Sequence, residues 1–267
     1  MIELRKRYGD WAIVAGSAIG LGESFCISLA QCGINIVMVD NQEESLIALS
    51  DRLIKKYRIE TFCIHIDLFK SDSFKQIMDD TMHLNVGILI YNAAFSSIKK
   101  FTSFTTGELD HFININTRTP LKLVQAFSKR LIQQNQPGGI LLMSSLSGLL
   151  GMQLIAPYAA SKAFAWNLAE SLHYELKAKN IDVMACVAGA TATEAYLQTN
   201  PSYGLIKPHV QHPIDVSKLA LKKLGRKTLY IPGFSNRMNY FILTRLMPRK
   251  MAARIVNRIM GKMYPNV

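Results

Sequence analysis

The chain of 267 residues is 49% apolar and 19% charged, so it can bury a large core, and intrinsic disorder is excluded. Glycine and proline follow no repeating period, which excludes collagen-like and low-complexity structure. The formal net charge of +12 is unevenly distributed. Residues 1–215 hold 19 basic and 19 acidic residues, whereas residues 216–267 hold 12 basic residues and no acidic one. The excess positive charge therefore belongs to the C-terminal tail.

The cysteines are scattered along the chain: Cys26, Cys32, Cys63 and Cys186. They lack the spacing of a metal site and are too few for a disulfide framework, so we expect a reducing compartment, the cytoplasm. His209 and His212 have no nearby acidic or cysteine partner, and no metal site is expected. We also expect neither a signal peptide nor a membrane-spanning segment.

Apolar runs rich in β-branched residues alternate with helical patterns along the chain. The runs predict strands at residues 11–15, 34–39, 61–66, 86–91, 139–143, 182–187 and 228–231. The helical patterns lie at residues 20–32, 43–57, 71–84, 108–135, 157–179 and 213–225. This alternation predicts one α/β domain: a Rossmann-like, doubly wound, mainly parallel seven-stranded sheet with helices on both faces. The irregular segment 190–213 is too long for an ordinary connection and is predicted to be a lid.

A glycine-rich turn follows the first predicted strand and opens a helix: Gly16, Ser17, Ala18, Ile19, Gly20, Leu21 and Gly22. Glycines at this spacing let a pyrophosphate approach the backbone at a helix N-terminus, although a tight connection without a ligand has the same pattern. Asp40 ends the second strand, where its carboxylate can bind ribose hydroxyls and repel a 2′-phosphate. No Lys or Arg lies between Asp40 and Arg52, so we predict NAD(H). A solvated or helix-capping Asp40 is the alternative. Asp67, after the third strand, is a candidate for the adenine amino group or for a turn.

Tyr158 and Lys162 are one helical turn apart, so their side chains share a face of the predicted helix 157–179. Tyr203 and Lys207 have the same spacing but lie among Pro201, Gly204 and Pro208, which argue against a helix. The first pair is therefore the candidate for acid/base chemistry.

Several motifs occur in one order along the chain: Gly16, Gly20, Gly22, Asp40, Asp67, Asn92-Ala93, Asn116, Ser144-Ser145, Tyr158, Lys162, Gly189, Thr191 and Thr193. In this order they resemble the short-chain dehydrogenase/reductase family, from about Tyr8 to Ile231. The resemblance implies Tyr158 as acid/base, Lys162 on the nicotinamide ribose, Ser145 on the substrate oxygen and Asn116 holding a relay water. It implies cofactor contacts by the glycine turn, Asp40, Asp67, Asn92, Ala93, Gly189, Thr191 and Thr193. The expected activity is hydride transfer between NAD(H) and a carbonyl or secondary alcohol.

Three positions depart from the family pattern. Ala15 stands where a threonine hydroxyl commonly ties the glycine turn to the fourth strand. The usual Asn-Asn-Ala-Gly reads Tyr-Asn-Ala-Ala at residues 91–94, and the usual Pro-Gly reads Ala188-Gly189. These changes remove no catalytic side chain, but they leave a non-catalytic, dinucleotide-binding pseudoenzyme as the alternative. For Asn116, an ordinary polar residue at a helix bend is the other interpretation.

Residues 8–14 and 232–237 resemble the branch with 3-oxoacyl-thioester reductases and hydroxysteroid dehydrogenases, which implies an apolar or lipid-like substrate. The lid contains apolar and aromatic residues that either cover such a substrate or pack the lid itself: Tyr196, Leu197, Tyr203, Leu205 and Ile206. The expected partners are this small molecule and further copies of the chain in a homo-oligomer, with no nucleic acid, although the basic tail keeps a nucleic-acid binder as a third class.

Residues 1–235 are predicted to form the dinucleotide-binding domain, and residues 236–267 a basic tail. After Pro248 the apolar residues recur every fourth position: Met251, Ile255, Ile259 and Met263. Basic residues recur beside them: Lys250, Arg254, Arg258 and Lys262. Such a helix either makes peripheral contact with an anionic membrane or packs its apolar stripe on the body or a sister subunit.

Overall fold

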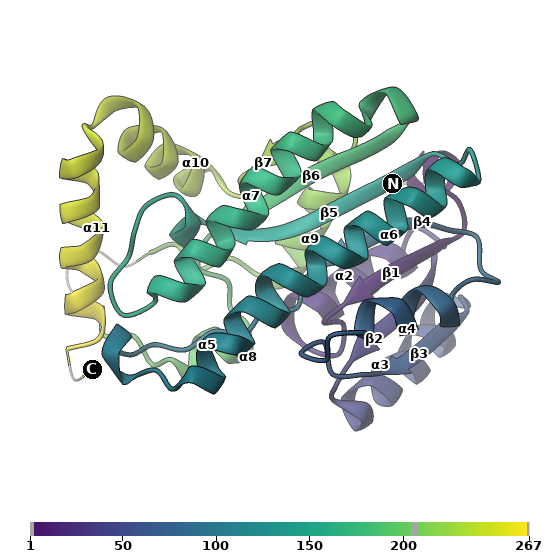
Figure 1. Cartoon of the computed structure of the whole chain (residues 1–267), viewed down its shortest axis with the longest axis horizontal. Coiled ribbons are helices and arrows are strands. Elements are labelled where there is room, and N and C mark those ends of the chain that lie inside the picture. The colour runs from purple at the N-terminus through teal and green to yellow at the C-terminus, as the bar shows by residue number, and fades with distance from the viewer. Residues whose placement is uncertain (1–2, 204–207, 266) are drawn as a thin grey trace.

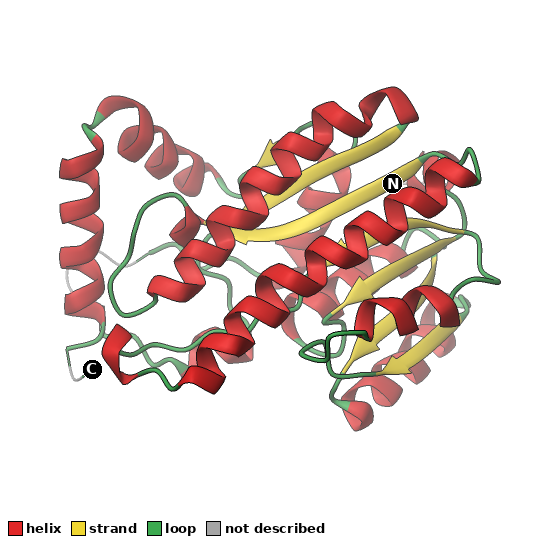
Figure 2. Ribbon diagram, in the orientation of Figure 1, coloured by secondary structure: helices red, strands yellow, loops and turns green. Residues whose placement is uncertain are grey.

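The computed structural model describes residues 3–203, 208–265 and 267. These residues form one seven-stranded sheet in which every paired strand is parallel, in the order β3-β2-β1-β4-β5-β6-β7 (Figure 2). The strands are β1 (Trp11–Ala15), β2 (Asn35–Asp40), β3 (Thr61–His65), β4 (Val86–Tyr91), β5 (Gly138–Ser145), β6 (Ile181–Ala188) and β7 (Leu229–Tyr230). The predicted fold class is confirmed. The strand order reverses between β1 and β4, the place where open α/β sheets bind ligands.

Helices cover both faces of the sheet. They are α1 (Glu3–Tyr8), α2 (Gly20–Ala30), α3 (Glu43–Tyr57), α4 (Ser73–Asp80), α5 (Thr106–Ile113), α6 (Thr119–Gln133), α7 (Ala156–Leu176), α8 (Glu194–Gln198), α9 (Pro213–Lys223), α10 (Phe234–Phe241) and α11 (Arg249–Met263). Phe25, Leu49 and Val216 bring α2, α3 and α9 into one apolar cluster. Phe127 and Ala169 bring α6 and α7, which cross the front of the sheet in Figure 1, into the other.

The helix predicted over residues 108–135 is interrupted in the structure. A π-helical turn, Asn114–Arg118, separates α5 from α6. The helix also starts earlier than predicted, because Thr105 and Glu108 form a reciprocal capping box. The structure adds α1 and α10, which lack a sequence pattern strong enough to predict them, and it shortens the helix predicted at 71–84 to α4.

The lid and the tail lie together at one end of the molecule. The lid contains the helix α8, and Thr191 forms an isolated parallel β-bridge with Gln211. Leu205, Ile206 and Lys207 of the lid lie outside the described residues. In Figure 1, α11 stands at the end opposite β3. None of the helices in the described ranges is long and apolar enough to span a membrane.

Candidate active site

The glycine turn is built so that only glycine fits at its first position. Gly16 has φ +78°, and a Cβ there would lie 2.6 Å from the Ala93 backbone nitrogen. Helix α2 begins after Ile19, whose apolar side chain provides no cap hydrogen bond. The first N–H groups of α2 therefore lack a side-chain partner and face the turn, as an anion site at a helix N-terminus requires. This cradle fits the pyrophosphate of a dinucleotide.

Hydrogen bonds tie the turn to β2 and β4. Asn92 donates its side-chain amide to the Gly16 carbonyl at 2.7 Å, and the backbone N–H groups of Asn92 and Ala93 both donate to the Ala15 carbonyl at 2.9 Å. The turn is therefore attached to β4 even though Ala15 lacks the threonine hydroxyl that commonly forms this link. The Ser17 hydroxyl is buried and donates to the Val39 carbonyl at 3.3 Å, so this side chain shapes the turn and does not face outward.

The two acids after β2 and β3 have different surroundings. Asp40 is 7% exposed, and its two carboxylate oxygens accept from the backbone of Ala18 at 2.9 Å and of Gln42 at 3.2 Å. The carboxylate is thereby fixed beside the glycine turn. Asp67 accepts from the Phe69 N–H at 2.9 Å, which is the turn geometry that the sequence left open, and its role at an adenine stays a prediction.

Tyr158, Lys162 and Ser145 come together where β5 ends and α7 begins. The ammonium of Lys162 is buried, donates to the Met143 carbonyl at 3.0 Å and lies 5.4 Å from the centre of the Tyr158 ring. Burial lowers the pKa of Lys162 to about 8 and raises the pKa of Tyr158 to about 12. A hydrogen bond from the Ser145 hydroxyl offsets part of the rise for Tyr158.

Asn116 sits in the π-helical turn and is locked by three hydrogen bonds. Its amide accepts from the Phe95 N–H at 2.7 Å and donates to the Phe95 carbonyl at 2.9 Å and to the Ser161 hydroxyl at 3.0 Å. Ser161 donates in turn to the Tyr158 carbonyl at 2.8 Å. A cavity of about 10 Å³ between α6, α7 and β5 is lined by both Asn116 and Lys162, a size that suits one water molecule.

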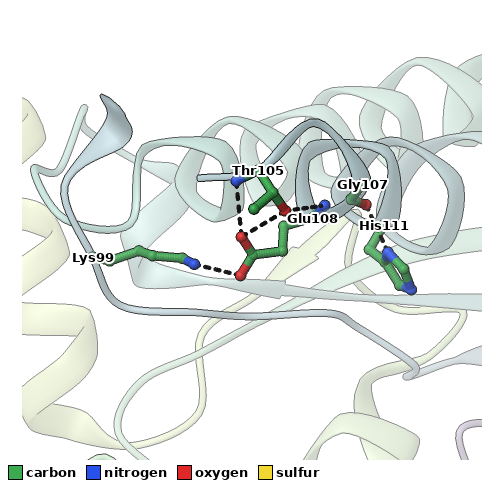
Figure 3. Close-up of polar contacts among 5 residues, drawn as sticks. All are labelled: Lys99, Thr105, Gly107, Glu108 and His111. Carbon is green, nitrogen blue, oxygen red and sulfur yellow. Dashed lines mark hydrogen bonds and ion pairs between the residues drawn. The ribbon is translucent and has the colours of Figure 1, made fainter. Parts of the chain in front are cut away.

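The connection after β4 is braced against the loop that precedes Tyr158. Lys99 forms an ion pair with Glu108 at 2.5 Å, and the other Glu108 oxygen accepts from Thr105 at 2.9 Å (Figure 3). The Lys99 ammonium is the main reason that the pKa of Glu108 falls to about 2. The Lys99 backbone N–H donates to the Leu154 carbonyl at 2.9 Å. Leu154 has φ +67°, a strained conformation for a leucine.

The segment after β6 carries three predicted cofactor residues. The buried hydroxyl of Thr191 donates to the Gly189 carbonyl at 3.0 Å, and Thr193 caps α8 by accepting from the Tyr196 N–H. A Cβ on Gly20 would lie 3.2 Å from the Thr193 side chain. The structure therefore places this segment directly against the glycine turn.

Two residues that sequence reasoning missed hold this segment in place. Gln211 exchanges backbone hydrogen bonds of 2.9 Å with Ala190 and Ala192. The buried amide of Asn236, near the start of α10, donates to the Gln211 side chain at 2.8 Å, and a Cβ on Gly189 would collide with it. The sequence motif at 232–237 contained Asn236, but no spacing rule connects it to Gln211.

Comparisons with known proteins identify the family of the chain. The model of the short chain dehydrogenase family matches residues 10–203. A 7β-hydroxysteroid dehydrogenase of Clostridium sardiniense is 28% identical over 88% of this chain and 90% of its own. A very-long-chain 3-oxoacyl-CoA reductase of Mus musculus is 28% identical over 94% of this chain and 79% of its own. A solved structure of a 7β-hydroxysteroid dehydrogenase, 25% identical, superposes with a TM-score of 0.87 over 95% of this chain and 98% of that chain.

Two more distant structures share the fold and hold different dinucleotides. A short-chain dehydrogenase of Sphingobium yanoikuyae in complex with NADPH has a TM-score of 0.78 at 24% identity, over 89% of this chain and 94% of its own. A 7α-hydroxysteroid dehydrogenase complexed with NADH has a TM-score of 0.74 at 21% identity, over 84% and 92%. The chain belongs to the short-chain dehydrogenase family and is an NAD(P)-dependent oxidoreductase that transfers hydride between nicotinamide and a carbonyl or secondary alcohol.

Proposed function

We propose that Tyr158 carries the proton in this reaction, with Ser145 on the substrate oxygen and Lys162 as the charge that adjusts Tyr158. The observation that carries the proposal is the convergence of these three side chains at one point, with the phenol hydrogen-bonded to Ser145 and the ammonium 5.4 Å from its ring. Bound nicotinamide supplies or accepts the hydride.

The charges at the site fit the roles proposed for Tyr158 and Lys162. A phenol with a pKa of about 12 gives up its proton too rarely at neutral pH, so it needs a neighbouring positive charge. Lys162, with a pKa of about 8, is mostly protonated at pH 7 and provides that charge. The cavity beside Asn116 and Lys162 has room for the relay water that the family resemblance implies.

For the cofactor we propose NAD(H). The fixed carboxylate of Asp40 supports this choice, because a 2′-phosphate beside it would meet like charge. The nearest basic residue downstream in the sequence, Arg52, already pairs with Glu23 at 2.6 Å. Asp67, Asn92 and the segment from Gly189 to Thr193 complete the proposed cofactor site.

For the substrate we propose a secondary alcohol or ketone on a large apolar skeleton. Relatives named for hydroxysteroids and for very-long-chain 3-oxoacyl-CoA support it, since both names denote compounds dominated by hydrocarbon. The lid contributes Tyr196, Tyr203 and the exposed Leu197, whose exposed fraction is 61%. These side chains provide an apolar cover of the kind such a substrate needs.

The domain division, the location and the assembly state are part of the same proposal. We place residues 1–235 in the catalytic domain and residues 236–267 in the tail. The four cysteines are free, which supports a cytoplasmic location. A homo-oligomer is supported by an apolar hollow of about 470 Å³ that includes Phe101 and Ile113.

The experiment is a titration with NADH and NADPH followed by turnover assays at the nicotinamide absorbance band, with hydroxysteroids, 3-oxoacyl thioesters and small ketones as substrates. We expect roughly 100- to 1,000-fold tighter binding of NADH, the scale of two like charges about 4 Å apart near a protein surface. Asp40→Ala removes most of that preference. Tighter binding of NADPH by the parent chain would refute the NAD(H) assignment, and turnover of small ketones alone would refute the substrate class.

A further inference from the structure

The side of α11 that packs on the body differs from the side that the sequence predicted. Ala252 and Met260 are buried, and Ala252 and Val256 pack against the core that includes α6 and α7. Met251 and Ile255, from the predicted stripe, remain 45% and 37% exposed. The packed face is thus shifted by one residue from the predicted one, and half of the apolar stripe is left at the surface.

Hydrogen bonds fix this orientation of α11. The Asn257 side chain accepts from the Gln153 N–H at 2.6 Å and donates to the Gly151 carbonyl at 2.9 Å. Gln153 donates its own side-chain amide to the Asn257 carbonyl at 2.7 Å. Because α-helical residues are about 100° apart, the side of α11 that faces away from the body carries Met251, Ile255 and their basic neighbours.

The outward face of α11 consists of two apolar and four basic side chains: Met251, Ile255, Lys250, Arg254, Arg258 and Lys262. All six are exposed. None of the four cations forms an ion pair with any residue in the described ranges, and residues 216–267 contain no acidic residue. Their counter-charge therefore comes from solvent ions or from a molecule bound to this face.

Further exposed apolar residues precede this face in the same C-terminal segment. Phe234 is 70% exposed, Phe241 47% and Leu246 65%. Scattered exposed apolar side chains are ordinary, but a contiguous group of them rimmed by polar residues marks a binding surface. Interleaved apolar and basic side chains are typical of helices that lie in the interface of an anionic bilayer.

We propose that the outward face of α11 docks on the surface of an anionic lipid bilayer. Anionic headgroups supply the missing counter-charge, and the acyl boundary takes up Met251 and Ile255. A second copy of the chain fits less well, because a symmetric contact through this face would oppose two sets of unpaired cations. A nucleic acid would satisfy the charge but would leave the apolar side chains in water.

Docking through this face brings the substrate site to the membrane, an inference that rests on the proposed apolar substrate. The lid is bonded to the end of the same helix: Ser202 donates its N–H to the Met263 carbonyl at 2.9 Å, and the hydroxyls of Thr199 and Tyr264 are 3.0 Å apart. At its other side α11 is bonded to the loop between Ser145 and Tyr158. A docked helix therefore holds the lid and the loop between Ser145 and Tyr158 about one helix diameter from the bilayer, on the body side of α11.

The test is co-sedimentation of the full chain with vesicles of phosphatidylcholine alone or mixed with phosphatidylglycerol. The parent chain should bind the anionic vesicles at low salt and dissociate from them at high salt. The double variant Arg254→Gln/Arg258→Gln should bind about 25-fold more weakly, from about 1 kcal/mol for each basic residue near an anionic surface. Met251→Ser/Ile255→Ser tests the apolar contribution in the same assay. Lys222→Gln/Lys227→Gln, an equal charge change on α9 and the loop after it, should bind as the parent does.

Turnover of a water-soluble ketone is measured for each variant in the absence of vesicles. It should match the parent, which separates the docking surface from the proposed function. Equal binding to neutral and anionic vesicles, equal binding by the Arg254/Arg258 and Lys222/Lys227 variants, or stronger retention on DNA than on anionic vesicles would overturn the proposal.

Discussion

Replacing Tyr158 with phenylalanine removes the proposed proton carrier and little else. The ring keeps its place beside the Lys162 ammonium, and the variant loses one hydrogen bond with Ser145. A lost hydrogen bond of this kind changes the free energy of unfolding by about 1 kcal/mol, so the variant should fold and bind dinucleotide. The rate should fall by about 10²- to 10⁴-fold, the usual contribution of a positioned acid/base. At 1.36 kcal/mol per tenfold, this loss corresponds to roughly 3 to 5 kcal/mol of activation free energy.

The matched control is Tyr203→Phe, at the tyrosine of the second Tyr/Lys pair in the sequence. Its hydroxyl lies 2.6 Å from that of Tyr196 within the lid, and phenylalanine keeps the aromatic ring, so kcat should change little. Initial rates at saturating cofactor, with cofactor affinity measured separately by titration, distinguish the two variants. Equal activity of both variants on a substrate that the parent turns over would refute the assignment of Tyr158.

Two further predictions concern buried groups of the site. Lys162→Met should abolish most turnover. It should also raise the free energy of unfolding at neutral pH, measured in urea, by about 1 to 3 kcal/mol. Burial lowers the pKa of Lys162 to about 8, so the buried ammonium destabilises the folded parent at neutral pH. In the parent, raising the pH above about 8 deprotonates buried Lys162, so the free energy of unfolding should increase. A Lys162→Met variant that is less stable than the parent at neutral pH would contradict this reasoning. Gly16→Ala should lower the free energy of unfolding by roughly 2 to 5 kcal/mol and weaken dinucleotide binding, because its φ of +78° and the Ala93 backbone at 2.6 Å leave no room for a Cβ. An unchanged Tm would contradict it.

The order of strands and helices was predictable because apolar runs record burial directly. β4 is buried at every position, and the sequence 86–91 is a continuous apolar run. The interruption at Asn116 was not predictable, because it depends on hydrogen bonds to Phe95, on a loop 21 residues away in the sequence. A local helical pattern contains no information about such a contact. The capping box of Thr105 and Glu108 did carry a local signal, and it defines the true start of α5.

The proposed catalytic side chains were identified from their order in the sequence, whereas the residues that support them were not. Tyr158 and Lys162 share a helical face by spacing alone, and β5 delivers Ser145 to them. The link between Gln211 and Asn236 joins two segments 25 residues apart, and neither side chain belongs to a motif with a known spacing. Gly189 gives the only local hint, because a glycine at a strand end often marks close approach by another part of the chain. In this fold the approaching group is the Asn236 amide.

The tail shows which part of an amphipathic pattern the sequence determines. Two apolar stripes run along α11, one through Met251 and Ile255 and the other through Ala252 and Met260. The spacing predicted the helix and singled out the first stripe, because it repeats every fourth residue beside the basic residues. The second stripe packs on the body, because the small side chain of Ala252 permits close packing and Asn257 then reaches the loop at Gly151. This packing leaves the first stripe among cations that have no partner in the described part of the chain. The same packing that joins α11 to the loop before Tyr158 therefore creates the surface proposed to meet the bilayer.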